Sequence, residues 1–128
     1  MNTIQSLFAP VGRFLLSLIF VMSGLNKITS FSGTQAYMDS VGVPGILLPV
    51  VIALEVLGGL AVILGWHTRV AAFLLAGFSL LSAVLFHSNL GDQVQMIMFM
   101  KNLGLAGGFL ILVAHGAGAF SLDARNKA

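Results

Sequence analysis

The chain has 128 residues, of which 58% are apolar and only 8% are charged. A soluble domain carries about 25% charged residues, so this composition excludes a soluble globular protein and predicts an integral membrane protein. The formal net charge of +2 comes from six Lys or Arg against four Asp or Glu. The chain therefore lacks the basic surface of a nucleic-acid-binding protein, and nucleic acid is not expected as a partner.

The chain contains no cysteine. Disulfides, a thiol relay and cysteine-ligated iron–sulfur clusters are therefore excluded within it. Any redox chemistry would depend on a borrowed cofactor or on a partner protein.

The first two membrane spans are expected in the N-terminal half, because about 20 helical residues cross the hydrocarbon core of a bilayer. One covers about residues 10–28 and is bracketed by Arg13 and Lys27. It has the basic and apolar regions of a signal peptide, but no A-x-A-like site follows, which favours a retained helix. The next covers about residues 46–66 and is interrupted only by Glu55.

Two further spans follow in the C-terminal half. The third covers about residues 70–87 without a formal charge, and the fourth covers about residues 94–115, interrupted only by Lys101. The links between spans are short, and the longest, between Thr29 and Gly45, contains Ser, Gly and Pro as helix breakers. The sequence predicts an all-α fold, in which residues 1–128 form a single domain with four transmembrane helices.

Four spans place both termini on one side of the membrane. Cytoplasmic loops carry an excess of Lys and Arg, and the terminal side has the larger number of these residues. On that side stand Arg13, Arg69, Arg125 and Lys127, against Lys27 and Lys101 on the other. The expected topology is a multi-pass membrane protein with both termini in the cytoplasm.

Two charges fall inside the predicted spans. With a rise of 1.5 Å per residue, Glu55 lies about 13 Å and Lys101 about 10 Å from the outer surface. An ionisable group facing lipid costs several kcal/mol, so such residues are normally turned into the bundle and paired. The depths predict an ion pair between Glu55 and Lys101.

Other polar residues are expected in the outer half of the membrane and complete a pocket there. Asn26 and Lys27 end the first span, His87 ends the third, and Asn102 follows Lys101. The pocket would have a slight positive excess and many hydrogen-bond donors. It would suit an oxyanion or the carbonyl oxygens of a quinone, and no metal is predicted.

Glycines share a helix face with the two intramembrane charges. Gly58 and Gly59 follow Glu55, while Gly104 and Gly108 follow Lys101 at helical spacing. Small residues in membrane helices admit a flat ligand or let two helices approach closely. The purely structural alternative therefore stays open, with a charge pair that locks the bundle and glycines that only pack.

Weaker candidates lie elsewhere. Arg13 is expected to snorkel to the cytoplasmic interface. His67 and His115 offer a less favoured haem site as a bis-histidine pair, and the methionines around Met98 offer a still less favoured copper site.

Five segments of the chain resemble the DoxX family of small bacterial membrane proteins. In order, these are "GRFLLSLIFVMSGLNKI", "YMDSVGVP", "LEVLGGLAVILGWHTRVAA", "LFHSNL" and "FMKNLGLAGGFLILVAHGAGAFSLD". The resemblance implies a four-helix inner-membrane bundle that acts as a quinol oxidase or thiosulfate:quinone oxidoreductase subunit with partner redox proteins. Its pattern falls on Arg13, Ser23, Gly24, Lys27, Glu55, Gly59, Arg69, His87, Lys101 and Asn102.

The favoured function is that of the membrane subunit of a quinone-linked oxidoreductase, an enzyme subunit that binds quinone or a small anionic substrate. Lys101 and Asn102 would bond a quinone oxygen, and Glu55 or His87 would exchange protons. Asn26, Lys27, Gly58 and Gly59 complete the predicted binding site. The expected partners are membrane lipid, a redox partner subunit and further copies of the chain.

The alternative is a non-catalytic membrane anchor or assembly protein whose buried charges are structural. A small-solute transporter is less favoured, because the spans lack an unwound pair interrupted by Gly and Pro.

Overall fold

The computed structural model describes residues 3–127, which form helices and no strands. In chain order the elements are α1 (Thr3–Thr29), α2 (Phe31–Ser40), the 3₁₀ helix η1 (Gly45–Leu47), α3 (Leu48–Leu64), α4 (Thr68–Phe86), α5 (Gln93–His115) and α6 (Leu122–Lys127). Among these residues, four segments are long and apolar enough to cross a membrane: α1, η1 with α3, α4, and α5. The predicted all-α fold with four spans is confirmed.

Two helix ends lie at other residues than the sequence predicted. α1 begins at Thr3 and passes through Pro10, which lies inside the helix and removes one backbone hydrogen bond. α3 ends earlier than expected because Gly65 adopts a left-handed conformation with φ of 72°. The N–H of Gly65 donates to the Val62 carbonyl at 3.1 Å, and the N–H of Trp66 donates to the Ala61 carbonyl at 2.8 Å. These two bonds are the pattern that closes a helix at glycine.

The segment predicted as the longest loop contains the helix α2. Its ten residues carry no strong apolar stripe, and so short a helix is marginal on its own. Tertiary contacts stabilise it: Met38 is buried, and the ring of Tyr37 stacks on that of Phe86 in α4 at 5.7 Å. The backbone N–H of Gly45 also donates to the Asp39 carboxylate at 2.8 Å. Hydropathy alone does not report such contacts.

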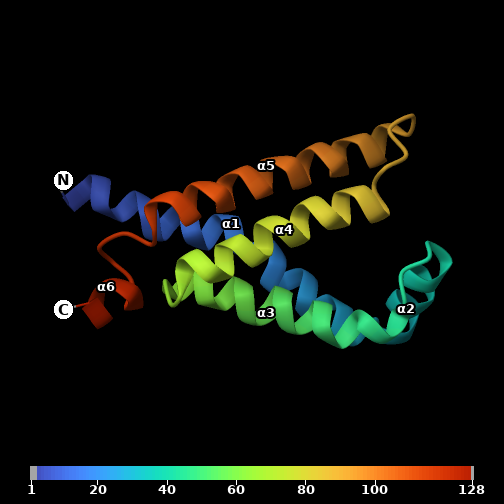
Figure 1. Cartoon of the computed structure of the whole chain (residues 1–128), viewed down its shortest axis with the longest axis horizontal. Coiled ribbons are helices and arrows are strands. Elements are labelled where there is room, and N and C mark those ends of the chain that lie inside the picture. The colour runs from blue at the N-terminus through green and yellow to red at the C-terminus, as the bar shows by residue number, and fades with distance from the viewer. Residues whose placement is uncertain (1–2, 128) are drawn as a thin grey trace.

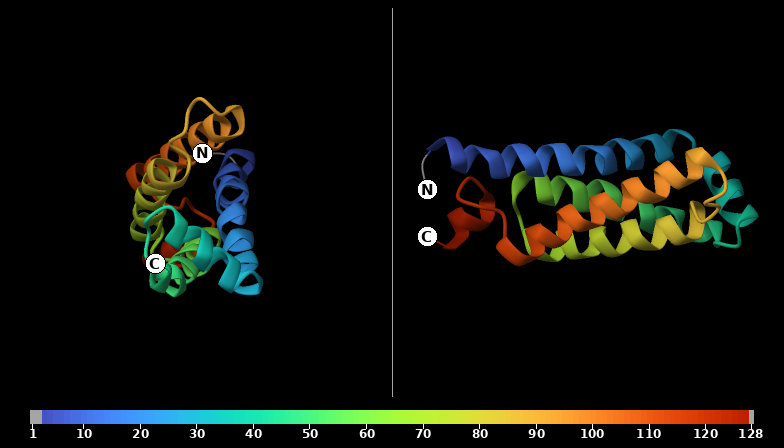
Figure 2. Two further views of the ribbon diagram at one scale, coloured as in Figure 1. Left: turned by 90° about the vertical axis from the view of Figure 1, so that its right-hand side faces the viewer. Right: turned by 90° about the horizontal axis from the view of Figure 1, so that it is seen from above.

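The long helices form two antiparallel pairs, α1 with α3 and α4 with α5, and the pairs meet along α3 and α4. The start of α1 and the short α6 lie at the same end of the bundle, as predicted (Figure 2). We call this the terminal end, and the opposite end, which carries α2, the α2 end. The pairs lie close together at the terminal end and diverge toward the α2 end (Figure 1). The cytoplasmic orientation of the termini stays a prediction.

Small residues hold each pair together. A Cβ atom on Gly59 of α3 would lie 2.7 Å from a methyl of Val21 and 3.3 Å from the backbone oxygen of Ser17 in α1. A Cβ atom on Gly24 would similarly lie 3.3 Å from the backbone nitrogen of Val56. Only glycine permits so close an approach of α1 and α3. α4 correspondingly buries small residues, namely Ala71, Ala72, Ala76, Ser79 and Ala83.

An aromatic cluster closes the space between the pairs at mid-length. The Phe20 ring of α1 packs edge to face on Phe109 of α5 and on Phe78 of α4. The ring centroids are 5.4 Å apart in the first pair and 6.4 Å apart in the second. Leu75 and Ala106 pack in the same buried cluster. The core therefore fills the terminal half of the bundle, and the diverging half is left to the site described next.

Candidate functional site

A cavity of about 500 Å³ lies between the two helix pairs, on the α2 side of Phe20. Most of its wall is aliphatic or aromatic, with polar groups at a few points. Its polar lining consists of Ser23, Lys27, Thr34, Tyr37, Glu55, Ser82, His87, Lys101 and Asn102. This combination of apolar walls and a few convergent polar groups is typical of small-molecule sites.

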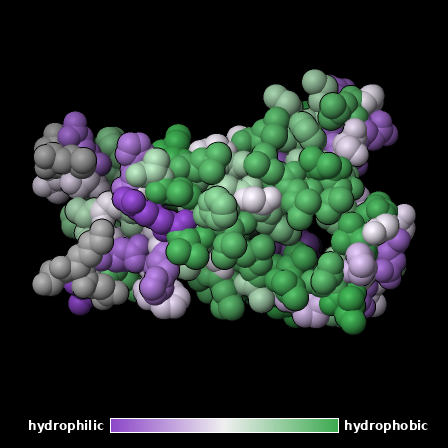
Figure 3. Space-filling model, viewed as in Figure 1, coloured by the Kyte–Doolittle hydropathy of each residue, from purple (hydrophilic) through white to green (hydrophobic). Residues whose placement is uncertain are grey.

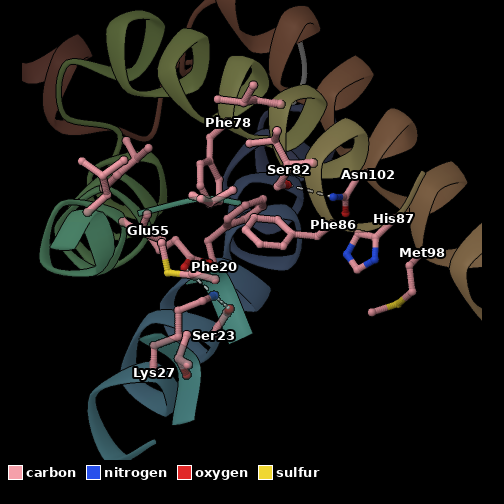
Figure 4. Close-up of a pocket in the computed structure, with 18 of the residues that line it drawn as sticks. Phe20, Ser23, Lys27, Glu55, Phe78, Ser82, Phe86, His87, Met98 and Asn102 are labelled. Carbon is pink, nitrogen blue, oxygen red and sulfur yellow. Dashed lines mark hydrogen bonds and ion pairs between the residues drawn. The ribbon is translucent and has the colours of Figure 1, made fainter. Parts of the chain in front are cut away.

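One cluster of polar side chains in the cavity comes from α1 and α3. The Lys27 ammonium donates to a Glu55 carboxylate oxygen at 2.7 Å and to the Ser23 hydroxyl at 2.7 Å (Figure 4). The Glu55 side chain is only 3% exposed, whereas that of Lys27 is 25% exposed. The carboxylate therefore depends on this ammonium, because a buried charge needs a counter-charge.

The predicted pair of Glu55 with Lys101 is wrong. The Lys101 ammonium lies 3.6 Å from the sulfur of Met98 in its own helix and forms no ion pair within residues 3–127, although the residue still lines the same cavity. α3 packs on α1 and α4, whereas α5 packs mainly on α4. Similar depth in the membrane was therefore not enough to bring the two side chains together.

Side-chain direction along the helix explains which lysine reaches Glu55. Side chains in an α-helix tilt toward its N-terminus. α1 runs toward the α2 end, so the Lys27 side chain points back into the bundle. α5 runs the other way, so Lys101 leans toward the α2 end and its water interface.

The second polar group belongs to α4 and α5. The side-chain amide of the buried Asn102 donates to the Ser82 hydroxyl at 3.0 Å, on the far side of the aromatic rings from Glu55 (Figure 4). His87 ends α4, and its Nδ1 lies 3.1 Å from the side-chain oxygen of Gln95. Within residues 3–127, no three His, Asp or Glu side chains gather in a way that could hold a metal ion.

The cavity brings together five of the eight predicted site residues: Lys27, Glu55, His87, Lys101 and Asn102. The other three lie outside its lining. Asn26 is exposed on α1, Gly58 faces Leu75 of α4, and Gly59 is packed against α1. The roles assigned to all eight in binding or catalysis stay predictions.

Arg13 does not snorkel to the interface as predicted, but is buried at the terminal end. Its guanidinium donates to the carbonyls of Val62 and Ile63 at 3.0 Å each, and also to the Phe120 carbonyl. The last carbonyls of a helix lack partners within it, so Arg13 satisfies the end of α3 and ties it to the C-terminal segment. A single arginine near a predicted interface carries no sequence signal that separates these two roles.

Asp123 closes the same end at the start of α4. Its carboxylate accepts the backbone N–H groups of His67 at 2.7 Å and Thr68 at 2.9 Å. Burial alone would raise the pKa of Asp123, but the hydrogen bonds from Thr68 and His67 outweigh it and lower the pKa below its ordinary value. The residue acts as an N-cap from a distant segment, which sequence reasoning missed.

Taken together, the spans and the cavity define a multi-pass, four-helix membrane protein with a polar pocket inside its bundle. The DoxX family model matches residues 8–88, and the chain belongs to the DoxX family. This confirms the resemblance found in its sequence motifs.

Two relatives from Escherichia coli K12 agree with that assignment. The chain is 49% identical over 123 residues to "Inner membrane protein YqjF" of Escherichia coli K12. The match covers 96% of this chain and 95% of that protein. It is 40% identical over 122 residues to "Inner membrane protein YphA" of the same organism. That match covers 90% of this chain and 87% of the relative. With four spans of its own, the chain is a multi-pass protein of the inner membrane.

A more distant relative is "Putative oxidoreductase CatD" of Bacillus subtilis 168. It is 33% identical over 73 residues, covering 57% of this chain and 54% of that protein. No solved structure matches the chain.

Proposed function

We propose that the chain is the membrane subunit of a quinone-linked oxidoreductase and that its cavity binds the quinone headgroup. A volume of about 500 Å³ falls within the range of small-molecule sites. The distant relative from Bacillus subtilis is named an oxidoreductase, which favours redox chemistry for this chain as well.

The observation that carries the proposal is the placement of two polar groups on opposite walls of an otherwise apolar cavity. Lys27 and Glu55 stand on one wall, Asn102 and Ser82 on the other, and the Phe20 ring lies between them (Figure 4). A quinone headgroup is a flat ring with a carbonyl oxygen on each of two opposite edges. Such a ring would meet a donor on each wall.

The chain's own residues would position the headgroup and exchange protons with it. A bound quinone would supply two-electron, two-proton chemistry. The Asn102 amide and the ammonium of Lys101 would donate hydrogen bonds to one oxygen, and Lys27 would donate to the other. Glu55 and His87 are the groups that would take up or release protons. Electrons would come from a partner subunit or a soluble donor.

The direct test is the amount of quinone that copurifies with the protein after gentle extraction, measured by mass spectrometry. Asn102→Ala and His87→Ala should each lower the quinone-to-protein ratio by at least about tenfold, the effect of 1.4 kcal/mol of lost binding energy. The matched controls are Asn26→Ala and His115→Ala, which remove the same side chains from exposed positions outside the cavity. Wild-type protein without any quinone would contradict the proposal, as would equal loss in the controls.

A second candidate function is a membrane anchor whose charges only hold the helices together. The ion pair between α1 and α3 favours it, because that pair joins two spans directly. Lys101→Met separates the two candidates, since Lys101 lines the cavity and pairs with no acid in the described part of the chain. Loss of quinone-linked turnover in a folded Lys101→Met variant supports the enzyme, and unchanged turnover supports the anchor.

A further inference from the structure

The cavity is covered at both of its ends along the bundle axis. Toward the terminal end it stops at the aromatic cluster of Phe20 and Phe78. Toward the α2 end it meets Met38, which is buried, and Tyr37, which is half-exposed. The Tyr37 ring stacks on Phe86 and so connects α2 to α4. A ligand entering from water at either end would have to displace one of these layers.

The side of the cavity between α3 and α4 is open instead. These helices diverge from their common hairpin (Figure 1), and the space-filling view shows a hollow between them (Figure 3). Each of these two helices has a cavity-lining residue that is strongly exposed, Val50 of α3 at 65% and Leu81 of α4 at 57%, and we take these two as the rim of the opening. Both are apolar and lie within membrane-spanning segments, so the opening faces acyl chains rather than water.

The polar groups of the cavity lie deeper than this rim. Glu55 and Asn102 are buried, whereas Val50 and Leu81 on the rim are each more than half exposed. A molecule that reaches them through the opening passes first between apolar side chains. The order of surfaces, with a polar interior and an apolar exit into lipid, matches a ligand with a polar head and a long apolar tail.

We propose that the ligand of this cavity is a tailed quinone dissolved in the bilayer, with its tail leaving between α3 and α4 over Val50 and Leu81. This inference rests on the proposed function and adds the ligand class and its route of entry. An isoprenoid tail and a phospholipid acyl chain share the same apolar chemistry. The polar groups of the cavity fit a quinone headgroup, and we therefore assign the tail to a quinone rather than to a phospholipid.

Two probes with one headgroup test the inference on full-length protein in lipid nanodiscs. Decylubiquinone carries a ten-carbon tail, and 2,3-dimethoxy-5-methyl-1,4-benzoquinone carries none. Val50→Trp and Leu81→Trp fill the opening and should weaken decylubiquinone binding by at least about tenfold. Binding of the tail-less quinone should change less than twofold, and its retention shows that each variant is folded.

Matched controls place tryptophan on the same helices, away from the opening. Leu57 of α3 is 66% exposed and Val84 of α4 is 60% exposed, and neither lines the cavity. Leu57→Trp and Val84→Trp should leave the binding of both probes unchanged. Because all variants share one bilayer, partitioning of the tailed probe into lipid cancels in the comparison.

The remaining outcomes separate this inference from the function on which it rests. If both probes bind wild-type protein and respond equally to all four substitutions, the tail route is wrong and the headgroup site stands. If neither probe binds, the proposed function fails and the inference fails with it. If spin-labelled phosphatidylglycerol contacts the wild-type opening while decylubiquinone does not bind, the opening holds a phospholipid chain and the inference is overturned. Val50→Phe and Leu81→Phe, with smaller rings, replace any tryptophan variant that fails to bind the tail-less quinone.

Discussion

The partner of Glu55 is set by the direction in which each lysine leaves its helix. Lys27 and Lys101 both line the cavity, yet only Lys27 approaches the carboxylate. The Lys27 side chain tilts back into the bundle and also contacts Ser23 one turn earlier. Lys101 tilts toward the α2 end and contacts Met98. One ammonium thus neutralises the buried acid, and the other remains available to a ligand.

Removing Lys27 should therefore destabilise the fold, whereas removing Lys101 should not. Lys27→Met leaves the Glu55 carboxylate buried without a counter-charge. The expected loss is about 1–3 kcal/mol of unfolding free energy, below the range for fully buried pairs because Lys27 is partly exposed. Lys101→Met should change it by less than about 0.5 kcal/mol. Equilibrium unfolding in mixed micelles measures both.

A second substitution checks that the loss arises from the unpaired acid. Glu55→Gln in the Lys27→Met background should recover part of the stability, since a neutral amide needs no counter-charge. Equal destabilisation by Lys27→Met and Lys101→Met, with the same recovery in both backgrounds, would contradict the observed pairing.

At the scale of the helices, glycine has two different uses in this chain. Gly24 and Gly59 lie where α1 and α3 touch, so each is needed for close packing. Gly104 and Gly107 lie on α5, where an added Cβ would meet nothing within 4 Å. A Cβ atom on Gly108, the other glycine of the stripe predicted on α5, would lie 3.1 Å from a methyl of Leu16 in α1. That stripe therefore packs against α1 at Gly108 and not at Gly104.

Alanine substitution should distinguish the two uses. Gly59→Ala forces a methyl against Val21 and the Ser17 backbone, which should cost about 1–3 kcal/mol, the range for overpacking. Gly107→Ala should be neutral or stabilise by up to about 1 kcal/mol, because alanine favours the helix. Thermal unfolding of the two variants against wild type measures the difference. A neutral Gly59→Ala would show that α1 and α3 are not in close contact.

The cap that Asp123 places on α4 should make stability depend on pH. Its folded pKa is lowered, so the stabilisation is complete above the ordinary carboxyl value of 3.8. It is lost as pH falls from that value through the lower folded pKa, because the unfolded state binds the proton more readily. Asp123→Ala should cost about 1 kcal/mol at neutral pH, and this difference should vanish in acid.

Asp92→Ala is the matched control for that experiment. Asp92 caps α5 within its own segment, by accepting the N–H groups of Val94 and Gln95. Its loss should cost similar stability without releasing the C-terminal segment. Hydrogen exchange over residues 119–125 should therefore rise only in Asp123→Ala. A rise in both variants, or in neither, would contradict the role assigned to Asp123.

At the scale of the whole molecule, hydropathy was sufficient to find the four spans, because lipid requires about 20 apolar residues in each. It missed α2, whose helix depends on Met38 and Tyr37 meeting other elements. Depth along the spans placed five predicted residues in one cavity. Depth does not specify which helices are neighbours, and for that reason the partner of Glu55 was predicted wrongly.

The same limit applies to the terminal end. Arg13 and Asp123 act through backbone groups of segments far away in the sequence. Backbone carbonyls and N–H groups occur at every residue, so no pattern of side chains marks such contacts in advance. Residue type and depth can predict the members of a polar site, and only the packing of helices decides their partners.

The central claim, a quinone cavity between two helix pairs, is tested most directly by cysteine protection. The chain has no cysteine, so Ser23→Cys and Ser82→Cys each introduce one thiol, from opposite walls of the cavity. Ser32→Cys and Ser88→Cys place one at exposed positions outside it. A small methanethiosulfonate reagent should modify all four, and decylubiquinone should slow modification at residues 23 and 82 only. Modification rates at those two residues that quinone leaves unchanged would contradict the claim.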